Sequence, residues 1–503
     1  MSDYIKLSPS DHVMIALRDL QPGETVQAAE SGGAAVTVLD PVPKGHKLLV
    51  KPVSQGDDVL KFGYSIGKAK EAIEAGHWVH THNLETGLRG KLEYVYSPAA
   101  TAAASENEPP APGELTFQGY VRDNGEVGIR NEIWILNTVG CINKTCEVLA
   151  KMASAEHGER VDGVFHFAHP YGCSQLGDDL KYTQQLLASL ANHGNAGGVL
   201  VVGLGCENNQ IDLFKEVLGE YDPNRVKFMR SQDVSDELET GMELIGELVE
   251  YASKFERQPV PVSRLKIGLK CGGSDGLSGI TANPLVGALS DRVIAQGGTA
   301  ILTEVPEMFG AETILMNRAS DEGVFHKIVD LVNDFKQYFI NHGQDIYENP
   351  SPGNKAGGIS TLEEKSLGCT QKGGHATVMD VVPYGKRITS HGLNLLEAPG
   401  NDLVSVTALS AGGAHIVLFT TGRGTPFGGP VPTVKISTNS ELAAHKRNWI
   451  DFNAGQLLEG KNMEALSGEL LDYLLQVASG DQQTRNERNG YREIAIFKDG
   501  VIL

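Results

Sequence analysis

The sequence predicts an α/β protein that begins with a small all-β module. Four short apolar runs rich in Val and Ile each lead to a cysteine, and such runs are typical of buried strands. Stretches with apolar residues at three- and four-residue spacing follow them, which predicts parallel sheets with helices on both faces. Residues 1–97 hold short alternating runs separated by Pro and Gly turns, which indicates a separate β-rich module. The four runs begin at Ile133, Val164, Val199 and Leu265 and lead to Cys141, Cys173, Cys206 and Cys271.

The composition limits the class of protein. The chain has 503 residues, which is too long for a single core, so two or three domains are expected. Its formal net charge of −20 argues against nucleic acid or an anionic membrane as the main partner. Six cysteines in so long a chain do not make a disulfide framework. No signal peptide or membrane-length apolar run is visible, so we expect a cytoplasmic protein with reduced thiols.

The elements can be assigned in order along the chain. The β-rich module, 1–97, is expected to hold one helix near Lys68–Glu74. Residues 98–116 are rich in Ala, Pro, Ser and Glu and predict a flexible linker. A second α/β domain covers 117–258, and a third covers 259–503 with a Gly-rich interruption at 349–374. The expected helices are Glu147–Ala155, Asp179–His193, Gln210–Tyr221, Ser235–Phe255, Pro284–Gln296 and Asp321–Gly343.

The strand-end cysteines point to a ligand site. In an open parallel sheet, ligands collect just beyond the carboxyl ends of the strands. The pattern therefore predicts several thiols along the carboxyl edge of one sheet, where a polar substrate or a metal would bind. The alternative is that each cysteine is a small buried hydrophobe.

Three histidines in the β-rich module suggest a metal site. His80 and His82 are two residues apart, so in a strand they share a face, and His46 lies on an expected hairpin tip that could join them. Neutral imidazoles suit iron, zinc or manganese. A surface strand with solvated histidines explains the same pattern.

Two strand–helix junctions in the second domain carry polar residues. Tyr171–Asp179 combines a strand end, a Gly-bounded turn and a helix start, which aims backbone N–H groups at an anion and places Gln175 there. At the next junction, Glu207 and Asn208 follow Cys206, where Glu207 could ligate a metal or bind a sugar hydroxyl. Helix capping is the alternative duty of these side chains.

Three loops of the C-terminal domain could bind an anion. Cys271–Pro284 is rich in Gly and hydroxyl residues, and Ser274, Asp275 and Ser278 could wrap a carboxylate or phosphate. It lacks the lysine of a nucleotide P-loop and is not GxGxxG. Lys355 or Lys372, in a Gly-rich loop, could bind a carboxylate or act as a base, or be a solvated loop lysine. Arg423 lies beyond another strand end and suits bidentate carboxylate recognition.

Together these sequence motifs resemble those of the altronate and galactarate dehydratase family over essentially the whole chain. The resemblance rests on Tyr171–Asp179, Gly203–Gln210, Cys271–Pro284, the segment 303–312, Asn349–Gly358 and Thr420–Gly429. It implies an N-terminal SAF-type β-clip domain, a linker and two α/β domains, the last a Rossmann-like variant. It also implies a hydro-lyase that converts D-altronate to 2-dehydro-3-deoxy-D-gluconate with Fe2+ or Mn2+. A homodimer is expected, with 117–258 as a candidate dimerisation domain.

The residues supply a mechanism that fits this chemistry. A base removes the C2 proton, a divalent cation stabilises the enediolate, and the C3 hydroxyl leaves. Lys355, His80 and Glu207 are the candidate catalytic residues. The expected substrate-binding residues are Ser274, Asp275, Ser278, Arg423, Gln175 and Asn208. The expected metal ligands are His46, His80, His82, Cys173, Cys206 and Cys271.

Two alternatives stay open at the level of sequence. One is a dehydratase for another sugar acid such as galactarate, which could use an iron–sulfur cluster held by Cys173, Cys206, Cys271 and Cys369. The other is a sugar-acid binding protein without catalysis, for which the histidines and cysteines would be unnecessary.

Overall fold

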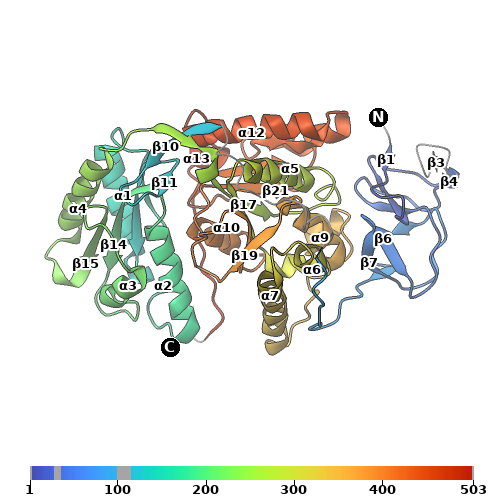
Figure 1. The fold of residues 1–503 in the computed structure, drawn as a ribbon, viewed down its shortest axis with the longest axis horizontal. Coiled ribbons are helices and arrows are strands. Elements are labelled where there is room, and N and C mark those ends of the chain that lie inside the picture. Colours follow the sequence, from blue (N-terminus) through green and yellow to red (C-terminus); the bar gives the residue numbers. More distant parts are fainter. Residues whose placement is uncertain (1–2, 28–34, 99–114, 501–503) are drawn as a thin grey trace.

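Three structural units lie in a row in the computed structural model, which describes residues 3–27, 35–98 and 115–500. Figure 1 shows the N-terminal β-rich module at one end, the C-terminal domain in the middle and the second domain at the other end. The described part of the chain is mixed α/β, with all-β sheets first and parallel sheets after them, so the predicted fold class is confirmed. Most of the predicted linker lies outside the described residues, at 99–114.

The N-terminal module is built from short antiparallel strands. Its sheets have the orders β1-β2-β5-β8, β6-β7-β9 and β3-β4. The helix expected near Lys68–Glu74 was a wrong prediction: this stretch completes β7 and continues into turns. The backbone of β7 pairs with β6 and β9 on either side, so sheet hydrogen bonds take the place of helical ones. The strands are Tyr4–Ile5 (β1), Val13–Ala16 (β2), Thr25–Gln27 (β3), Ala35–Thr37 (β4), Lys47–Leu49 (β5), Asp58–Lys61 (β6), Tyr64–Ala69 (β7), Trp78–Val79 (β8) and Leu84–Glu85 (β9).

The second domain is a four-stranded parallel sheet between helices. Its strand order is β13-β12-β14-β15, and every residue of the two central strands is buried, as expected for strands covered on both faces. The strands are Glu132–Asn137 (β12), Val164–His166 (β13), Ala196–Gly203 (β14) and Val226–Arg230 (β15). The helices are Asn143–His157 (α1), Gly177–Ala191 (α2), Ile211–Leu218 (α3) and Glu237–Ala252 (α4), which overlap the four expected here.

The C-terminal domain holds a seven-stranded parallel sheet of order β19-β20-β18-β17-β21-β22-β23. The chain starts in the middle, at β17, builds toward one edge and then returns to add β21 beside β17. This change of direction is the topological switch point of a Rossmann-like sheet, where a crevice opens at the carboxyl ends of the strands. The strands are Lys266–Cys271 (β17), Thr299–Leu302 (β18), Val378–Val382 (β19), Gly392–Leu396 (β20), Ile416–Thr421 (β21), Thr433–Ser437 (β22) and Phe452–Asn453 (β23).

Nine helices of the C-terminal domain are described, including the two expected from the sequence. They are Ala282–Ala295 (α5), Glu312–Met316 (α6), Glu322–Asn341 (α7), Pro352–Ala356 (α8), Leu362–Cys369 (α9), Asp402–Ala411 (α10), Ser440–His445 (α11), Met463–Ser479 (α12) and Arg485–Asn489 (α13). The segment 349–374, read from sequence as a Gly-rich interruption, contains α8 and α9, and all eight residues of α9 are buried. No helix of the described chain is long and apolar enough to cross a membrane.

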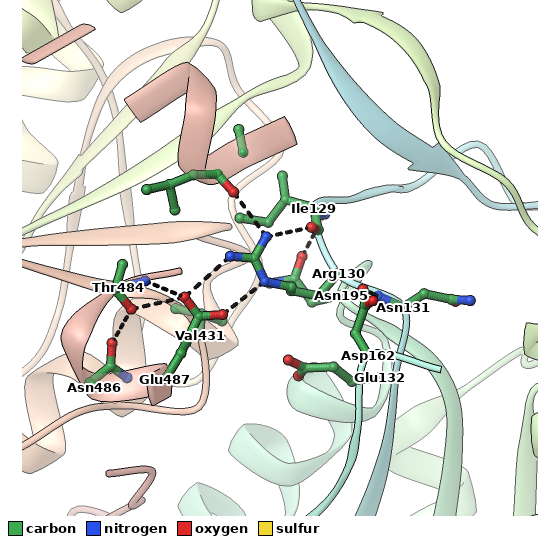
Figure 2. A network of polar contacts seen from close by, with 12 residues as sticks. Ile129, Arg130, Asn131, Glu132, Asp162, Asn195, Val431, Thr484, Asn486 and Glu487 are labelled. Carbon is green, nitrogen blue, oxygen red and sulfur yellow. Dashed lines mark hydrogen bonds and ion pairs between the residues drawn. The ribbon is translucent and has the colours of Figure 1, made fainter. Parts of the chain in front are cut away.

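A short antiparallel ribbon and a buried ion pair join the second and C-terminal domains. The ribbon pairs β10 (Thr116–Val121) with β16 (Gln258–Pro261) and with β11 (Val127–Gly128). Figure 2 shows the guanidinium of Arg130 against the carboxylate of Glu487, with Nε 2.8 Å from Oε1. Arg130 also donates to the carbonyls of Ile129 and Val477. Because both charges are buried and fully bonded, this contact fixes the two domains relative to each other.

Candidate functional site

Buried charges gather at the carboxyl edge of the seven-stranded sheet. Glu304 follows β18, and its carboxylate lies between the ammonium groups of Lys270, in β17, and Lys372. The Lys372 Nζ is 2.8 Å from Oε2, and the Cys271 amide donates to the same oxygen at 3.0 Å. Glu304 adopts φ of 71°, in the left-handed region that non-Gly residues rarely visit, and such strain collects at functional sites. Burial raises the pKa of this carboxyl to about 7, so it can exchange a proton near neutral pH.

A second buried pair lies beside the first. Lys365 of α9 places Nζ 2.8 Å from Oε1 of Glu307 and also donates to the side-chain oxygens of Asn349 and Asn354. The Cys369 thiol donates to the other Glu307 oxygen at 3.0 Å. Burial would raise the pKa of Glu307, but Lys365 and its neighbouring lysines lower it to about 2, so the carboxyl is ionised.

The third group of buried charges spans the boundary with the N-terminal module. Glu364 of α9 accepts from Lys47 Nζ at 2.8 Å and from Lys61 Nζ at 2.8 Å. Both lysines belong to the N-terminal module, and all three side chains are at most 3% exposed. Burial would raise the pKa of Glu364, but the two ammonium groups lower it from 4.5 to about 2. Two cations on one carboxylate leave an excess positive charge at this boundary, and burial accordingly lowers the pKa of Lys47 to about 8.

A small polar pocket lies next to this excess charge. It is lined by Lys61 and Phe62 from the N-terminal module, by residues 274–279, and by Glu364, Lys365, Gly368 and Cys369 around α9. Its volume of about 10 Å³ is room for one water molecule. A larger cavity of about 570 Å³ lies behind Asn349, but aromatic side chains of α7 and Phe497 form much of its wall. Of these two cavities, the small pocket has the ion pairs and serine hydroxyls that a sugar acid needs.

The loop after β17 brings three predicted substrate-binding residues to the small pocket. Ser274, Asp275 and Ser278 all line it. Asp275 accepts from Ser278 Oγ at 3.0 Å and from Thr438 Oγ1 at 2.9 Å, which holds the loop in shape. Cys271 is buried below the loop, with its Sγ 2.7 Å from Ser274 Oγ, rather than exposed beside a ligand.

Glycines let the N-terminal module approach this loop closely. A Cβ at Gly276 would lie 2.0 Å from the carbonyl oxygen of Gly45, and one at Gly358 would lie 2.5 Å from the same atom. The Gly276 amide also donates to the Gly357 carbonyl at 2.7 Å. The turn that carries His46 thus rests directly on the loop after β17 and on the segment after α8.

The histidines of the N-terminal module form an aromatic cluster around Trp78. The ring centroids of His46 and His80 are 5.1 Å apart, and His80 stacks on Trp78. His82 is exposed on the Trp78 ring, 5.1 Å away between centroids. His46 Nδ1 accepts from Trp78 Nε1, and the ring also meets the Ala356 carbonyl. His80 Nδ1 pairs with Ser360 Oγ at 2.8 Å, and burial lowers its pKa to about 4, so this imidazole is neutral near pH 7.

This cluster does not fit a mononuclear metal site. Within the described ranges, no three or more His, Cys, Asp or Glu side chains are grouped to hold one metal ion. The six expected ligands are split between the N-terminal module, the second domain and β17. The metal assignment stays a prediction, and we derive no catalytic step through such an ion.

Lys355 and Arg423 lie near the pocket without lining it. Lys355 is partly buried in α8, next to Asn354, whose Nδ2 donates to the Ser274 carbonyl at 2.8 Å. Arg423 is exposed, and its amide donates to the Gly273 carbonyl at 3.0 Å, which joins the loop after β21 to the loop after β17. These loops thus meet at the switch-point crevice that the topology predicts. Among the described residues, neither Lys355 nor Arg423 has an ion-pair partner there.

The remaining predicted residues occupy a different edge, in the second domain. Cys173, Gln175, Cys206, Glu207 and Asn208 follow β13 and β14. Both Glu207 oxygens are used: Oε1 accepts from Thr138 Oγ1 at 2.6 Å and Oε2 from the Gly205 amide at 2.6 Å. The Asn208 side chain accepts from the Ser174 amide at 2.8 Å. The sequence predicted these thiols at the carboxyl edge of one sheet. They lie at the edges of two sheets, because Cys271 belongs to the seven-stranded sheet of the C-terminal domain.

Sequence reasoning missed the charges at the boundary. Lys47, Lys61, Glu304, Glu307, Glu364 and Lys365 were assigned no role, and Lys372, the alternative to Lys355 as a loop lysine, is instead buried against Glu304. One signal was present: Thr361 followed by Glu364 is the pattern of a helix start, and Thr361 does cap α9 by accepting from the Glu364 amide. Nothing in the sequence indicated that α9 would be buried under another module.

Comparison with known proteins agrees with this three-part architecture. Family models match residues 2–87 (altronate/galactarate dehydratase SAF domain), 119–253 (D-galactarate dehydratase/altronate hydrolase, second domain) and 262–502 (D-galactarate/altronate dehydratase, C-terminal). The chain belongs to the altronate/galactarate dehydratase family, a family of hydro-lyases, which confirms the resemblance seen in its sequence.

Relatives with three different activities match this chain. The altronate dehydratase of Bacillus subtilis is 53% identical over 100% of both chains. The galactarate dehydratase (L-threo-forming) of Escherichia coli is 30% identical over 99% of this chain and 97% of its own. The (2R)-sulfolactate sulfo-lyase of Chromohalobacter salexigens matches as two subunits: beta is 30% identical over 76% of this chain and 97% of its own, and alpha is 37% identical over 10% of this chain and 52% of its own.

The first prediction concerns the buried triad. We expect Glu364→Gln to destabilise the contact between the N-terminal module and α9 by about 3–5 kcal/mol, because it leaves Lys47 and Lys61 buried without a counter-charge. The pKa of Glu364 is lower in the folded than in the unfolded protein, so its contribution is present above pH 4.5 and is lost as pH falls toward about 2. The difference between wild type and variant should therefore shrink below about pH 5.

Hydrogen exchange of β5 and β6 from about pH 7 to about pH 3 measures this contribution. Lys68→Ala, which removes an exposed pair with Asp58 in the same module, is the control and should change stability by less than about 1 kcal/mol. An equal wild-type-to-variant difference at both ends of this pH range would show that Glu364 is not the titrating group.

The second prediction concerns close packing at Gly276. We expect Gly276→Ala to weaken docking of the N-terminal module by about 1–3 kcal/mol, because its Cβ would meet the Gly45 carbonyl. Gly353→Ala is the matched control in α8, since a Cβ there meets no atom within 4 Å. Limited proteolysis between module and domain reports docking. Equal protection of the two variants would contradict the close approach.

Proposed function

We propose that the protein dehydrates a sugar acid, D-altronate, to 2-dehydro-3-deoxy-D-gluconate. The observation that carries the proposal is the pair of buried lysines, Lys47 and Lys61, on the single carboxylate of Glu364 beside a hydroxyl-lined pocket, in a chain of net charge −20. A local cationic site of this kind attracts a carboxylate against the field of the whole protein. The 53% identity to an altronate dehydratase over both full chains supports the same substrate.

The three relatives suggest which part of the substrate the site recognises. Altronate, galactarate and sulfolactate are all 2-hydroxy acids with a leaving group on C3, hydroxyl in the first two and sulfonate in the third. Each elimination can begin by removing the C2 proton beside the carboxylate, and the negative charge that develops then spreads onto the carboxylate. Cations at the carboxylate therefore stabilise the transition state more than the substrate.

The pocket residues can be given roles on this basis. Lys61 and Lys365 border the pocket and would hold the carboxylate. Ser274, Asp275 and Ser278 would hold sugar hydroxyls, as expected from the sequence. His80 is a neutral imidazole joined to the pocket wall through Ser360 and Glu364, so it is a candidate base together with Lys355. We assign no step to Fe2+ or Mn2+, because the histidine cluster does not present three ligands.

Substrate entry requires the pocket to open. Its volume is room for one water, whereas a six-carbon acid needs several hundred cubic ångströms. Lys61 and Phe62 form the part of its wall that comes from the N-terminal module, and Phe62 has a strained φ of 61°. Movement of this turn would admit the substrate and then enclose it, which excludes water from the reaction. The homodimer and the cytoplasmic location expected from the sequence remain parts of the proposal.

The third prediction tests carboxylate binding. We expect Lys61→Met to lower kcat/KM for altronate about 10–100-fold, mainly through kcat, because it removes a cation whose contact with the carboxylate strengthens in the transition state. Lys47 still pairs with Glu364 in this variant, so the module stays docked. Lys51→Met, at an exposed lysine of the same module, should leave both constants unchanged. Steady-state kinetics with purified protein gives both. An unchanged kcat/KM in Lys61→Met would remove this lysine from the site.

The fourth prediction concerns substrate choice. We expect kcat/KM for altronate to exceed that for galactarate about tenfold or more, because the second carboxylate of galactarate would be desolvated without a cation of its own. Parallel assays of the two acids with the same enzyme preparation measure the ratio. Similar values would place the protein among general sugar-acid dehydratases, and no turnover of either acid would favour a binding protein.

A further inference from the structure

Three cysteines are exposed at one edge of the second domain. Cys141, Cys173 and Cys206 follow β12, β13 and β14, which are neighbours in the sheet, and each is preceded by glycine. Free cysteine is among the residue types most often buried. Cys146, in α1 of the same domain, is buried as expected. Three exposed thiols at three adjacent strand ends therefore call for a function.

Hydrogen bonds hold the three cysteine loops against one another. The Gly140 amide donates to the Tyr171 carbonyl at 2.8 Å, which joins the first loop to the second. The Asn209 amide donates to the Gly172 carbonyl at 3.0 Å, which joins the second loop to the third.

Side chains and close packing complete the connection. Glu207, next to Cys206, binds Thr138 of the first loop, so the third and first loops are joined as well. A Cβ at Gly172 would lie 1.9 Å from the Thr138 carbonyl, so the backbones touch at the residue before Cys173. The three cysteines thus belong to one rigid, prearranged group of loops.

Polar groups beside the cysteines lack partners within the described ranges. Gln175 is 1% exposed and Asn209 is fully buried, yet Gln175 Nε2 and Asn209 Oδ1 have no hydrogen-bond partner there. Buried polar groups without partners are rare, and a bound ligand or ion is one explanation for a pair of them beside exposed thiols. Ser174, between Cys173 and Gln175, has a φ of 59°, so the chain is also strained at this point.

We propose that Cys141, Cys173 and Cys206 bind a cuboidal iron–sulfur cluster of the [4Fe–4S] type. Thiolates are the usual ligands of such clusters, and each thiolate binds a different iron, so the sulfurs need wider spacing than around a single ion. The three hydrogen-bonded loops bring three such ligands to one edge of the sheet. The inference is independent of the proposed sugar-acid pocket, which lies in another part of the chain.

This assignment differs from the set of cysteines expected for a cluster from the sequence. Cys271 and Cys369 are buried in the C-terminal domain, where Cys271 meets Ser274 and Cys369 donates to Glu307. In the proposed site, Cys141 is a cluster ligand in place of Cys271 and Cys369. Three protein ligands leave one iron without a thiolate, and that iron could bind an oxygen ligand such as a hydroxy acid. The NH2 group of Gln175 is a donor for a cluster sulfide or thiolate.

Anaerobic purification of the full-length protein followed by iron and sulfide analysis tests the proposal. We expect ~4 iron and ~4 acid-labile sulfide per chain, with the visible absorption and electron paramagnetic resonance signal of a cluster after reduction. Cys141→Ala, Cys173→Ala and Cys206→Ala should each lower the sulfide content about tenfold or more. Cys146→Ala and Cys369→Ala should keep the cluster. Iron without sulfide, or full cluster content in any of the three variants, overturns the assignment.

A second measurement uses only the wild-type chain, so that misfolded variants cannot obscure the result. Anaerobic alkylation with iodoacetamide and peptide mass spectrometry should show Cys141, Cys173 and Cys206 protected before iron chelation and modified after it. Equal modification before and after chelation, in protein shown to contain iron and sulfide, would place the cluster elsewhere.

Discussion

The fold depends on partners for the charged side chains of helix α9, because this helix places them where water cannot reach them. Glu363, Glu364 and Lys365 are consecutive and buried, so each needs a partner of its own. Glu363 accepts from Thr86 and the Gly87 amide, Glu364 binds Lys47 and Lys61, and Lys365 binds Glu307. Two of the three partner sets come from the N-terminal module. Docking of that module therefore covers Glu363 and Glu364 and supplies their partners in the same step.

The ion pairs that satisfy the buried charges of α9 also border the candidate site. Two lysines on Glu364 leave positive charge in excess, and the small pocket opens beside it, between Phe62 and the Ser274–Ser278 loop. Close approach of the Gly45 hairpin to Gly276 and Gly358 brings module and loop together without side chains between them. A carboxylate substrate would complete the charge balance. The family relation places this chain among enzymes that act on sugar acids and on sulfolactate, and a shared 2-hydroxy carboxylate is the part of those substrates that such a site can recognise.

The carboxyl ends of the strands carry different groups in the two parallel sheets. In the C-terminal domain, the strand ends are closed by ion pairs, with Lys270 and Lys372 on Glu304, and Cys271 is enclosed among them. In the second domain, the strand ends expose their thiols, and the loops are held by hydrogen bonds through Glu207 and Asn209. The first arrangement suits an anionic organic substrate, and the second suits soft metal ions. The buried pair of Arg130 and Glu487 keeps these two edges in a fixed relation (Figure 2).

The sequence by itself determined the fold class, since the apolar runs at β12, β14 and β17 and the helical spacing after them are local features. It also placed Ser274, Asp275 and Ser278 in a loop after a strand, and the structure brings all three to one pocket. Only the tertiary structure decided that Cys271 belongs to a different sheet from Cys173, and that Glu364 meets Lys47 and Lys61 from some 300 residues away. Residue type and spacing do not encode such partners. A buried charge is fixed by which surfaces come together, and that depends on the packing of the whole chain.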